Sequence, residues 1–195
     1  MIRLFTALCK VLLKKVSEEQ AFCDALDDFS LYRMQCPRCG AVGKLSGHGI
    51  YRRNHVSYIG DGIVDYQVSP CRVKCSSCGT THALLPDTLT PYSPYTLSFK
   101  LMVLIAYYER EATVVDICSI FGIAASTLYQ WKKLIVAHKE FMLGVLISRK
   151  TPALAFMRSL LGSSNISDIL HRFFRKYGFS FMQGASASAA HSVPP

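Results

Sequence analysis

The sequence has no apolar run long enough to cross a membrane. Its longest run, Leu101 to Tyr108, falls far short of the roughly 20 residues that a bilayer requires. The stretch "MIRLFTALCKVLLKKV" does not fit a secretion signal, because Lys10 interrupts its apolar residues and no small-residue cleavage site follows. We therefore expect an amphipathic N-terminal helix in a cytoplasmic protein with no membrane partner.

Acidic residues are scarce relative to basic ones. The chain has 22 Lys and Arg against 13 Asp and Glu, a net charge of +9. Because residues 1–35 hold equal numbers of the two signs, the whole excess lies at 36–195. A basic region of this kind favours nucleic acid or an acidic membrane surface as partner, and a basic protein without such a partner is the alternative.

The shortage of acids also argues against catalysis. After Trp131 the acidic residues are Glu140 and Asp168, and no strand pattern surrounds them. Nuclease and strand-transfer sites need several carboxylates to hold two metal ions. No Ser/His/Asp arrangement or glycine-rich phosphate loop takes their place. We therefore predict that the protein is not an enzyme.

Periodicity divides the chain into helical and strand-rich parts. Residues 2–30 carry apolar residues at helical spacing, with Ser17 and Gln20 placed as a capping box for a second short helix. Residues 34–90 are rich in glycine, and Gly60-Asp61-Gly62 separates two alternating runs as a hairpin turn would. The predicted fold class is α+β. The expected parts are an N-terminal helical segment at 1–33, a strand-rich domain at 34–90, a helical domain at 95–136, C-terminal helices at 137–181 and a disordered tail at 182–195.

Cysteine is the residue type with the clearest pattern. Cys36-Pro-Arg-Cys39-Gly40 and Cys75-Ser-Ser-Cys78-Gly79 are two copies of C-x-x-C-G on either side of the predicted strands. Each pair can deliver two sulfurs to one point, and four thiolates are a common ligand set for structural zinc. A redox pair is the weaker interpretation, because no βαβ pattern surrounds either motif. The spacing predicts a zinc ribbon with Cys36, Cys39, Cys75 and Cys78 as ligands of a structural Zn²⁺ ion.

Other residues near the motifs leave the ligand set open. Cys71 precedes Cys75 on a predicted strand and could compete for the metal, although a buried thiol is favoured. His82 follows Cys78 at a spacing that zinc sites use, but four thiolates already complete the site. Cys9, Cys23 and Cys118 lie in helical patterns, and we expect them to be core thiols.

A second pattern covers residues 111–135. Thr113 and Asp116 predict the capped start of one helix, and Gly122 predicts its end. A second helix is expected from about Ala125, with a buried stripe formed by Leu128, Trp131 and Ile135. Two short helices joined by a tight apolar turn are typical of a helix-turn-helix, although an ordinary helical hairpin is the alternative. The expected DNA contacts are Ser126, Tyr129, Gln130 and Lys133 on the outer face, with Thr127 and Lys132 at its margins.

Residues 33–136 as a whole resemble the head region of insertion-sequence transposases. "CPRCG", "HGIYRR" and "RVKCSSCGTTHALLPDTLTPY" resemble the zinc-ribbon head, and "FGIAASTLYQWKK" resembles the helix-turn-helix. The similarity is strongest to a family of uncharacterised bacterial proteins with that head. It implies DNA binding linked to mobile elements and adds Arg52 and Arg53 to the expected contacts. Ala124 departs from the pattern, because such helices often begin with Ser or Thr as N-cap.

Two functions remain at the level of the sequence. The first is a zinc-stabilised, sequence-specific protein that binds double-stranded DNA in the nucleoid and has no catalytic domain. The second is an adaptor that binds a transposase or a transcription component, for instance through the apolar stripe of the N-terminal helix. Both leave a homodimer open.

Overall fold

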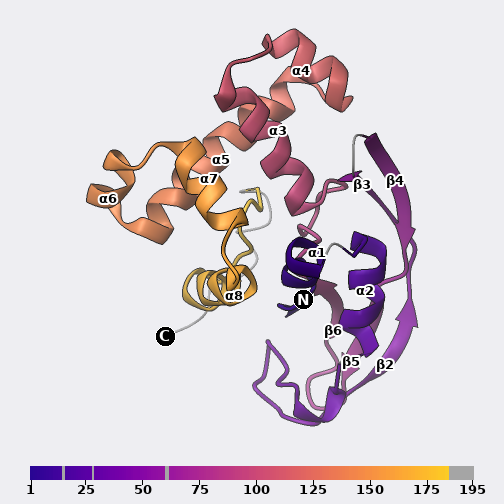
Figure 1. The fold of residues 1–195 in the computed structure, drawn as a ribbon. Coiled ribbons are helices and arrows are strands. Elements are labelled where there is room, and N and C mark those ends of the chain that lie inside the picture. The colour runs from indigo at the N-terminus through magenta and orange to yellow at the C-terminus, as the bar shows by residue number, and fades with distance from the viewer. Residues whose placement is uncertain (15, 28, 60–61, 185–195) are drawn as a thin grey trace.

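The computed structural model describes residues 1–14, 16–27, 29–59 and 62–184 of the chain. This part has a mixed α+β fold, with the strands gathered on one side of the molecule and most helices on the other (Figure 1). The strands are β1 (Ile2–Leu4), β2 (Leu45–Ile50), β3 (Arg53–Ile59), β4 (Gly62–Val68), β5 (Cys71–Cys75) and β6 (Thr81–Pro86). The helices are α1 (Ala7–Lys14), α2 (Glu18–Asp27), the 3-10 turn η1 (Leu31–Arg33), α3 (Leu97–Glu109), α4 (Val114–Phe121), α5 (Ala125–Leu143), α6 (Val145–Lys150), α7 (Ala153–Leu161) and α8 (Ile166–Tyr177).

The strands form a four-stranded sheet and a separate two-stranded ribbon. The sheet order is β1-β6-β5-β2, in which β1 runs parallel to β6 and the other neighbours are antiparallel. In the ribbon, β3 and β4 pair from Arg53 with Val68 to Ile59 with Gly62. Of the predicted turn between them, Gly60 and Asp61 lie outside the described residues.

The N-terminal end differs from the expected helix. Residues Ile2–Leu4 form strand β1, and all three side chains are buried. Their partners are Leu84, Leu85 and Pro86, far along the chain. The prediction of a helix from residue 2 was wrong because a three-residue strand carries too little periodicity to be recognised without its partner.

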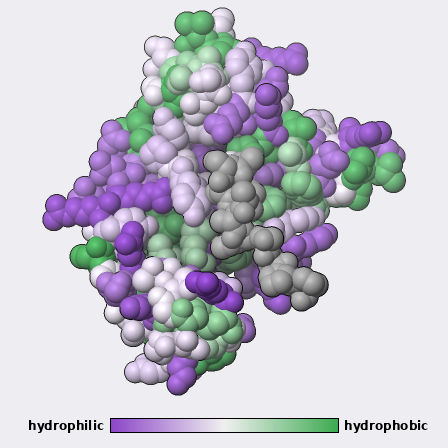
Figure 2. Space-filling view, turned by 180° about the vertical axis from the view of Figure 1, so that it is seen from behind, coloured by the Kyte–Doolittle hydropathy of each residue, from purple (hydrophilic) through white to green (hydrophobic). Residues whose placement is uncertain are grey.

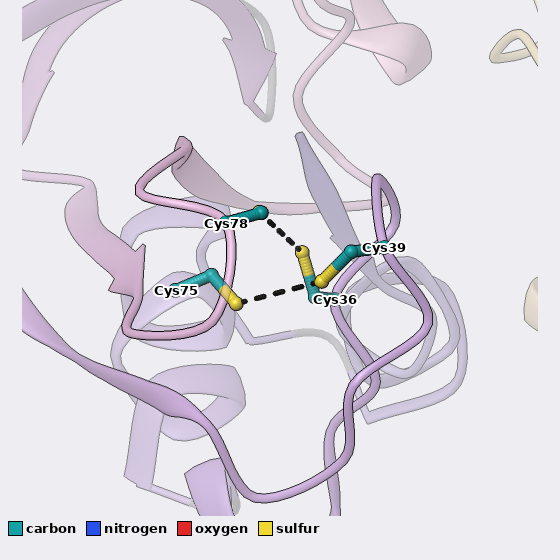
Figure 3. A group of neighbouring side chains, drawn as sticks. All are labelled: Cys36, Cys39, Cys75 and Cys78. Atoms are coloured by element: carbon teal, nitrogen blue, oxygen red, sulfur yellow. Dashed lines mark hydrogen bonds between the residues drawn. The ribbon is translucent and has the colours of Figure 1, made fainter.

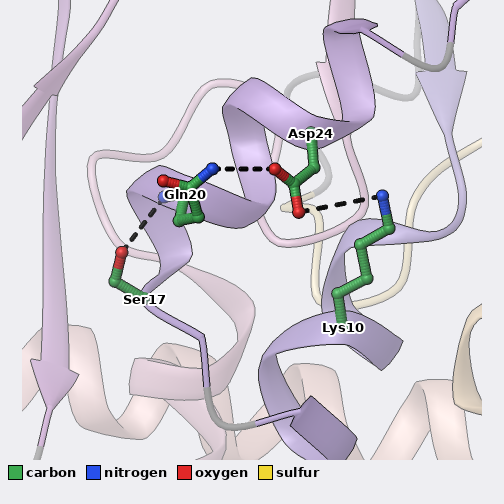
Figure 4. A network of polar contacts seen from close by, with 4 residues as sticks. All are labelled: Lys10, Ser17, Gln20 and Asp24. Atoms are coloured by element: carbon green, nitrogen blue, oxygen red, sulfur yellow. Dashed lines mark hydrogen bonds and ion pairs between the residues drawn. The ribbon is translucent and has the colours of Figure 1, made fainter.

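The start of α2 confirms half of the predicted capping box (Figure 4). The Ser17 hydroxyl accepts a 3.1 Å hydrogen bond from the backbone N–H of Gln20. The Gln20 side chain does not return this bond but donates to Asp24 at 2.8 Å. The other carboxylate oxygen of Asp24 lies 3.9 Å from the Lys10 ammonium, so this side chain also joins α2 to α1.

The largest apolar core lies among the helices. As expected from its nearly all-apolar sequence, α3 is central, and Phe99 and Leu101 are fully buried. The predicted α5 stripe is also buried and faces it. The same cluster includes Leu8 of α1, so the helix at the N-terminus packs on the helices near the C-terminus.

The C-terminal part continues further into the core than predicted. Met182 is fully buried; its N–H donates to His138 at 2.9 Å, and its carbonyl accepts from Lys100 at 3.3 Å. The expectation of a disordered tail was therefore wrong for residues 182–184, and its remainder, 185–195, lies outside the described residues. Gly162 and Gly178 are the C-terminal caps of α7 and α8.

Helix α5 is much longer than its sequence pattern indicated. It continues for 19 residues to Leu143, and the short helix α6 follows after Gly144. Among the described residues, no single helix has both the length and the apolar character needed to cross a membrane. Helices α4 and α5 meet both criteria only when they are taken together, and the chain bends by 101° between them.

Candidate functional site

The structure brings four cysteines from two loops to one point (Figure 3). Cys36 and Cys39 come from the loop after η1, Cys75 ends β5, and Cys78 lies in the turn between β5 and β6. The sulfur of Cys36 lies 3.7 Å from that of Cys78, and the sulfur of Cys39 lies 3.7 Å from that of Cys75. All four sulfurs lie within 4.8 Å of one another.

The two loops have the same backbone hydrogen bonds. In the first, the N–H of Gly40 donates to the carbonyl of Cys36 at 2.9 Å, and the N–H of Cys36 donates to Ala41 at 2.9 Å. In the second, Gly79 and Cys75 repeat the first bond at 2.9 Å, and Cys75 donates to Thr80 at 3.0 Å. Both glycines have the positive φ that the motif predicts, +75° and +70°. The doubled motif thus folds into two equivalent turns.

Bonds between the two loops fix their relative position. The backbone N–H of Ser76 donates to the carbonyl of Lys44 at 2.8 Å, close to where Leu45 pairs with Cys75. The Arg38 guanidinium donates to the Thr80 hydroxyl at 2.8 Å. The sulfurs therefore face one another because the β2–β5 pairing holds both loops at one end of the sheet.

The sulfur positions fit a metal site and not a disulfide. All eight cysteines of the chain lie in its described part and are free thiols. A disulfide needs two sulfurs about 2.05 Å apart. A tetrahedron of thiolates with metal–sulfur bonds of about 2.3 Å has edges of about 3.8 Å, close to the two shortest separations here. The cluster could therefore hold a metal ion.

Two thiols of the cluster have pKa values that are shifted in opposite directions. Hydrogen bonds from the side chain and backbone of Thr80 lower the pKa of Cys78 to about 6. A hydrogen bond from Ala41 acts to lower the pKa of Cys39, but desolvation and the three neighbouring thiols outweigh it and raise that pKa to about 11. Four thiolates this close repel one another, so a bound cation is needed to hold all of them deprotonated.

His82 lies next to the cluster, and its spacing from Cys78 alone did not decide whether it is a metal ligand. Its Nε2 lies 3.4 Å from the sulfur of Cys36, and its side chain is buried. His82 stands outside the four-cysteine group but can donate a hydrogen bond to one of its thiolates. The cross-strand register could have indicated this contact, because His82 pairs with Val73, which shares a strand face with Cys75.

The remaining cysteines separate into two kinds. Cys71 lies outside the four-cysteine group and packs against the small apolar cluster beside it, as the buried-thiol interpretation predicts. Cys9 and Cys118 are half-buried against the helical core. Cys23 is exposed, so the prediction of a core thiol was wrong there. It lies on the face of α2 opposite the buried Ala21 and Ala25.

The second candidate site is the pair α4 and α5. The Thr113 hydroxyl accepts from the N–H of Asp116, and the Asp116 carboxylate accepts from the N–H of Thr113, which confirms the predicted capping box. Gly122 ends α4 with φ of +61°, and the buried Ile123 fills the turn. Helix α5 starts at Ala125 with Ala124 as N-cap and no side-chain cap, so Ser126 does not cap a later start.

The outer face of α5 is placed as the sequence predicts. Leu128, Trp131 and Ile135 are buried. On the other side, Ser126, Tyr129, Gln130 and Lys133 are exposed, and Thr127 is half-buried. Their role in DNA binding stays a prediction.

Residues 36–131 match the family model described as a domain of unknown function (DUF6431). The DUF6431 match begins at Cys36, the first of the four clustered cysteines, and ends at Trp131, so it spans both cysteine pairs and the α4–α5 turn. It agrees with the expected similarity to a family of uncharacterised proteins. No curated protein and no solved structure matches the chain. The similarity to transposases therefore stays a prediction.

Three of the basic residues expected to contact DNA differ in their surroundings. Arg52 is exposed. The Arg53 guanidinium donates to the carbonyls of Ser93 and Thr90, at 2.6 and 3.3 Å, and so holds the segment before α3. Lys132 donates to the hydroxyl of Tyr107 at 2.8 Å. Arg53 thus has a structural task that its sequence position did not indicate.

Proposed function

We propose that the protein is a zinc-stabilised, sequence-specific binder of double-stranded DNA without a catalytic domain of its own. In this proposal Cys36, Cys39, Cys75 and Cys78 form the zinc ribbon, and α4 and α5 form a helix-turn-helix. The protein would act on the nucleoid and be related to the DNA-binding regions of mobile elements. The observation that carries the proposal is the α4–α5 pair with its exposed polar face.

The metal part of the proposal rests on the donor set. Four thiolates close a tetrahedral zinc site and leave no position open for a substrate, so the ion would have a structural role. The protein contributes the two glycine turns, which orient the sulfurs, and His82, which can donate to Cys36. Bound zinc would supply the charge that keeps the four thiols deprotonated.

The DNA part rests on the angle and the surface of two helices. The 101° bend between α4 and α5 lies within the range of about 90–120° found for helix-turn-helix pairs. The first turns of α5 present the polar side chains of Ser126 and Gln130. These side chains can contact base edges when the helix lies in the major groove. Lys133 and Arg52 are exposed cations that suit phosphates. We leave Arg53 out of this surface.

The test is a selection of bound duplexes from a random pool with zinc-loaded protein. We expect one enriched sequence, and a palindrome would indicate a homodimer. Gln130→Ala should relax the preference at one position, whereas Lys133→Ala should weaken all sequences alike. Arg149→Ala on α6 removes the same charge at a distance and should leave binding unchanged. No enrichment together with no salt-dependent binding would contradict the proposal.

An adaptor is the second candidate, and helix α6 favours it. Val145, Leu146 and Ile147 expose 46%, 78% and 59% of their surface. Helix α6 lies at the outer edge of the helical side of the molecule (Figure 1). The space-filling view shows hydrophobic and hydrophilic residues side by side on a projecting part of the surface (Figure 2). The N-terminal helix is a poorer contact surface than its sequence indicated, because Leu8 is buried in the core.

The two candidates make different demands on α6. For an adaptor, Leu146→Asp should abolish stoichiometric co-purification with a protein partner and leave duplex binding unchanged. For a DNA-binding protein without such a partner, the same variant should change neither measurement. Co-purification of the parent with one protein, together with no duplex binding at low salt, would favour the adaptor.

A further inference from the structure

A cavity with two cations on its wall lies beside helix α5, which carries the proposed DNA contacts. A larger cavity, of about 460 Å³, lies in another part of the molecule. The cavity beside α5 has a volume of about 330 Å³ and lies where the end of α3, the loop before α4 and the second turn of α5 meet. Tyr107, Tyr108, Arg110, Thr113 and Lys132 contribute to its lining. None of the functions assigned above uses Arg110 or the two tyrosines.

Arg110 occupies a backbone conformation that favours glycine. It ends α3 in the left-handed region, with φ of 60° and ψ of 26°. Helices α4 and α8 end in the same conformation, but there the residues are Gly122 and Gly178. Arginine is strained in this region and glycine is not. The chain therefore has an arginine where the backbone alone would select glycine, which indicates a use for the side chain.

The hydrogen-bond donors on the cavity wall keep protons that do not bond to other described residues. The Arg110 guanidinium makes no hydrogen bond or ion pair with any described residue. Lys132 uses one of its three protons on the Tyr107 hydroxyl, at 2.8 Å. A hydroxyl that accepts one bond keeps its own proton to donate. Arg110, Lys132 and Tyr107 can therefore all donate to one ligand.

Nearby acids do not neutralise these cations. Glu109 accepts an ion-paired bond from Arg158 at 2.5 Å, and the Asp116 carboxylate accepts from the hydroxyl of Thr113 at 2.6 Å. Glu111 is exposed and does not line the cavity. A wall with two cations, a phenolic donor and no acid suits an anion with several oxygens.

We propose that this cavity binds one backbone phosphate of the DNA duplex, held by the Arg110 guanidinium, the Lys132 ammonium and the Tyr107 hydroxyl. This inference rests on the proposed DNA-binding function and adds the anchor that positions it. Lys132 lies on the same helix as Gln130, two residues further along. A phosphate fixed at Lys132 would therefore set the depth and register at which α5 meets the base edges.

The decisive variant is Arg110→Gly. It removes the cation and relieves the backbone, so the melting temperature should stay the same or rise. Duplex affinity should fall about tenfold or more, as for the loss of a charge-assisted hydrogen bond. The slope of log affinity against log salt should fall by about one, equally for preferred and unrelated sequences. Arg110→Lys should keep most of the slope, and Arg149→Ala should change neither quantity.

The outcomes separate this inference from the proposed function. Parent-like affinity and salt slope in Arg110→Gly would overturn the phosphate site while leaving DNA binding intact. If the parent itself binds no duplex, the proposed function fails. In that case, titration with inorganic phosphate, monitored through the NMR signal of the Arg110 side chain, tests whether the cavity binds an anion at all. A saturating shift that Lys132→Met abolishes would support an anion site for another ligand, and no shift would overturn it.

Discussion

The region around the four cysteines and the helical region bury very different amounts of apolar surface. Among the described residues, the buried cluster beside the cysteines has six members: Ile2, Cys36, Leu45, Val73, Cys75 and Leu84. The helical cluster has twenty, including the edge-on rings of Phe99, Phe121 and Trp131, and the half-buried Tyr95 stacks on Phe99 from outside it. Two of the six members near the cysteines are themselves candidate ligands.

This difference suggests two sources of stability in one chain. The helical region can fold through apolar burial, each large side chain contributing roughly 1.5–3 kcal/mol. The cysteine region has too few buried side chains for that and would depend on a metal ion for the remainder. The comparison can be tested by removing each source separately.

Metal removal should have the largest effect. Structural zinc contributes about 10 kcal/mol or more in zinc-finger peptides. A chelator, or Cys36→Ser, should therefore disorder the four-stranded sheet while most helical signal remains in circular dichroism. Amide NMR signals from residues 34–50 and 71–86 should collapse first. Metal analysis of the parent should give about one zinc per chain.

Cys23→Ser is the matched control for this experiment. Cys23 is exposed and lies outside the cluster. The variant should keep the parent's metal content and its resistance to chelator. A purified parent protein without metal, or one whose sheet survives chelation, would contradict the metal-dependent half of the comparison.

Truncation of the central ring of the helical core should have the next largest effect. Phe99 is fully buried against three other aromatic rings. Phe99→Ala should lower the free energy of unfolding by about 3–5 kcal/mol. Urea denaturation measures this loss, and metal content should stay near that of the parent in the protein that remains folded. Equal loss of metal and helix would show that the two regions unfold as one.

A buried lysine should make stability depend on pH in the helical region. Burial, assisted by the charge of Arg53, lowers the pKa of Lys100 from 10.5 to about 7. Between these values the unfolded chain binds a proton that the folded chain does not, so this residue lowers stability as the pH falls from about 10.5 to about 7. Lys100→Met should remove that slope in urea denaturation at pH 7 to 10. The exposed Lys133→Met should retain it.

The smallest expected effect concerns the cap of α4. Thr113→Ala should cost about 1 kcal/mol by urea denaturation at neutral pH. Hydrogen bonds from Thr113 lower the pKa of Asp116. The stabilisation from Asp116 is therefore complete above its unfolded pKa and is lost as the pH falls through the folded pKa. The stability difference between the parent and Thr113→Ala should narrow at acid pH, because the bond from the Thr113 hydroxyl to the carboxylate is lost while the bond from the N–H of Asp116 to that hydroxyl remains. A constant difference would contradict this account.

Local patterns were sufficient for much of the candidate sites. The two C-x-x-C-G motifs predicted both turns and the convergence of their sulfurs, because each motif encodes its own hydrogen bonds. The capping box at Thr113 and the stripe at Leu128, Trp131 and Ile135 were likewise confirmed. These features depend on residues only a few positions apart, which is why sequence alone was enough.

Features that depend on distant partners were missed. Strand β1 exists because Ile2–Leu4 meet β6, and the burial of Met182 depends on Lys100 and His138. The role of Arg53 depends on the carbonyl of Ser93. In each case the contact joins segments that are tens of residues apart, so local periodicity cannot predict it. The DNA role of α5 also stays a prediction, because an exposed polar face does not by itself name its ligand.

Leu8 and Met182 belong to one apolar cluster, which has a consequence for folding during translation. On the ribosome, α3 to α5 leave the exit tunnel well before α8 and residues 180–183. Their apolar faces therefore stay exposed until α8 and residues 180–183 have also left the tunnel. Such a nascent chain is a natural client for chaperones, and contacts of this sequence separation favour slow closure of the core after release.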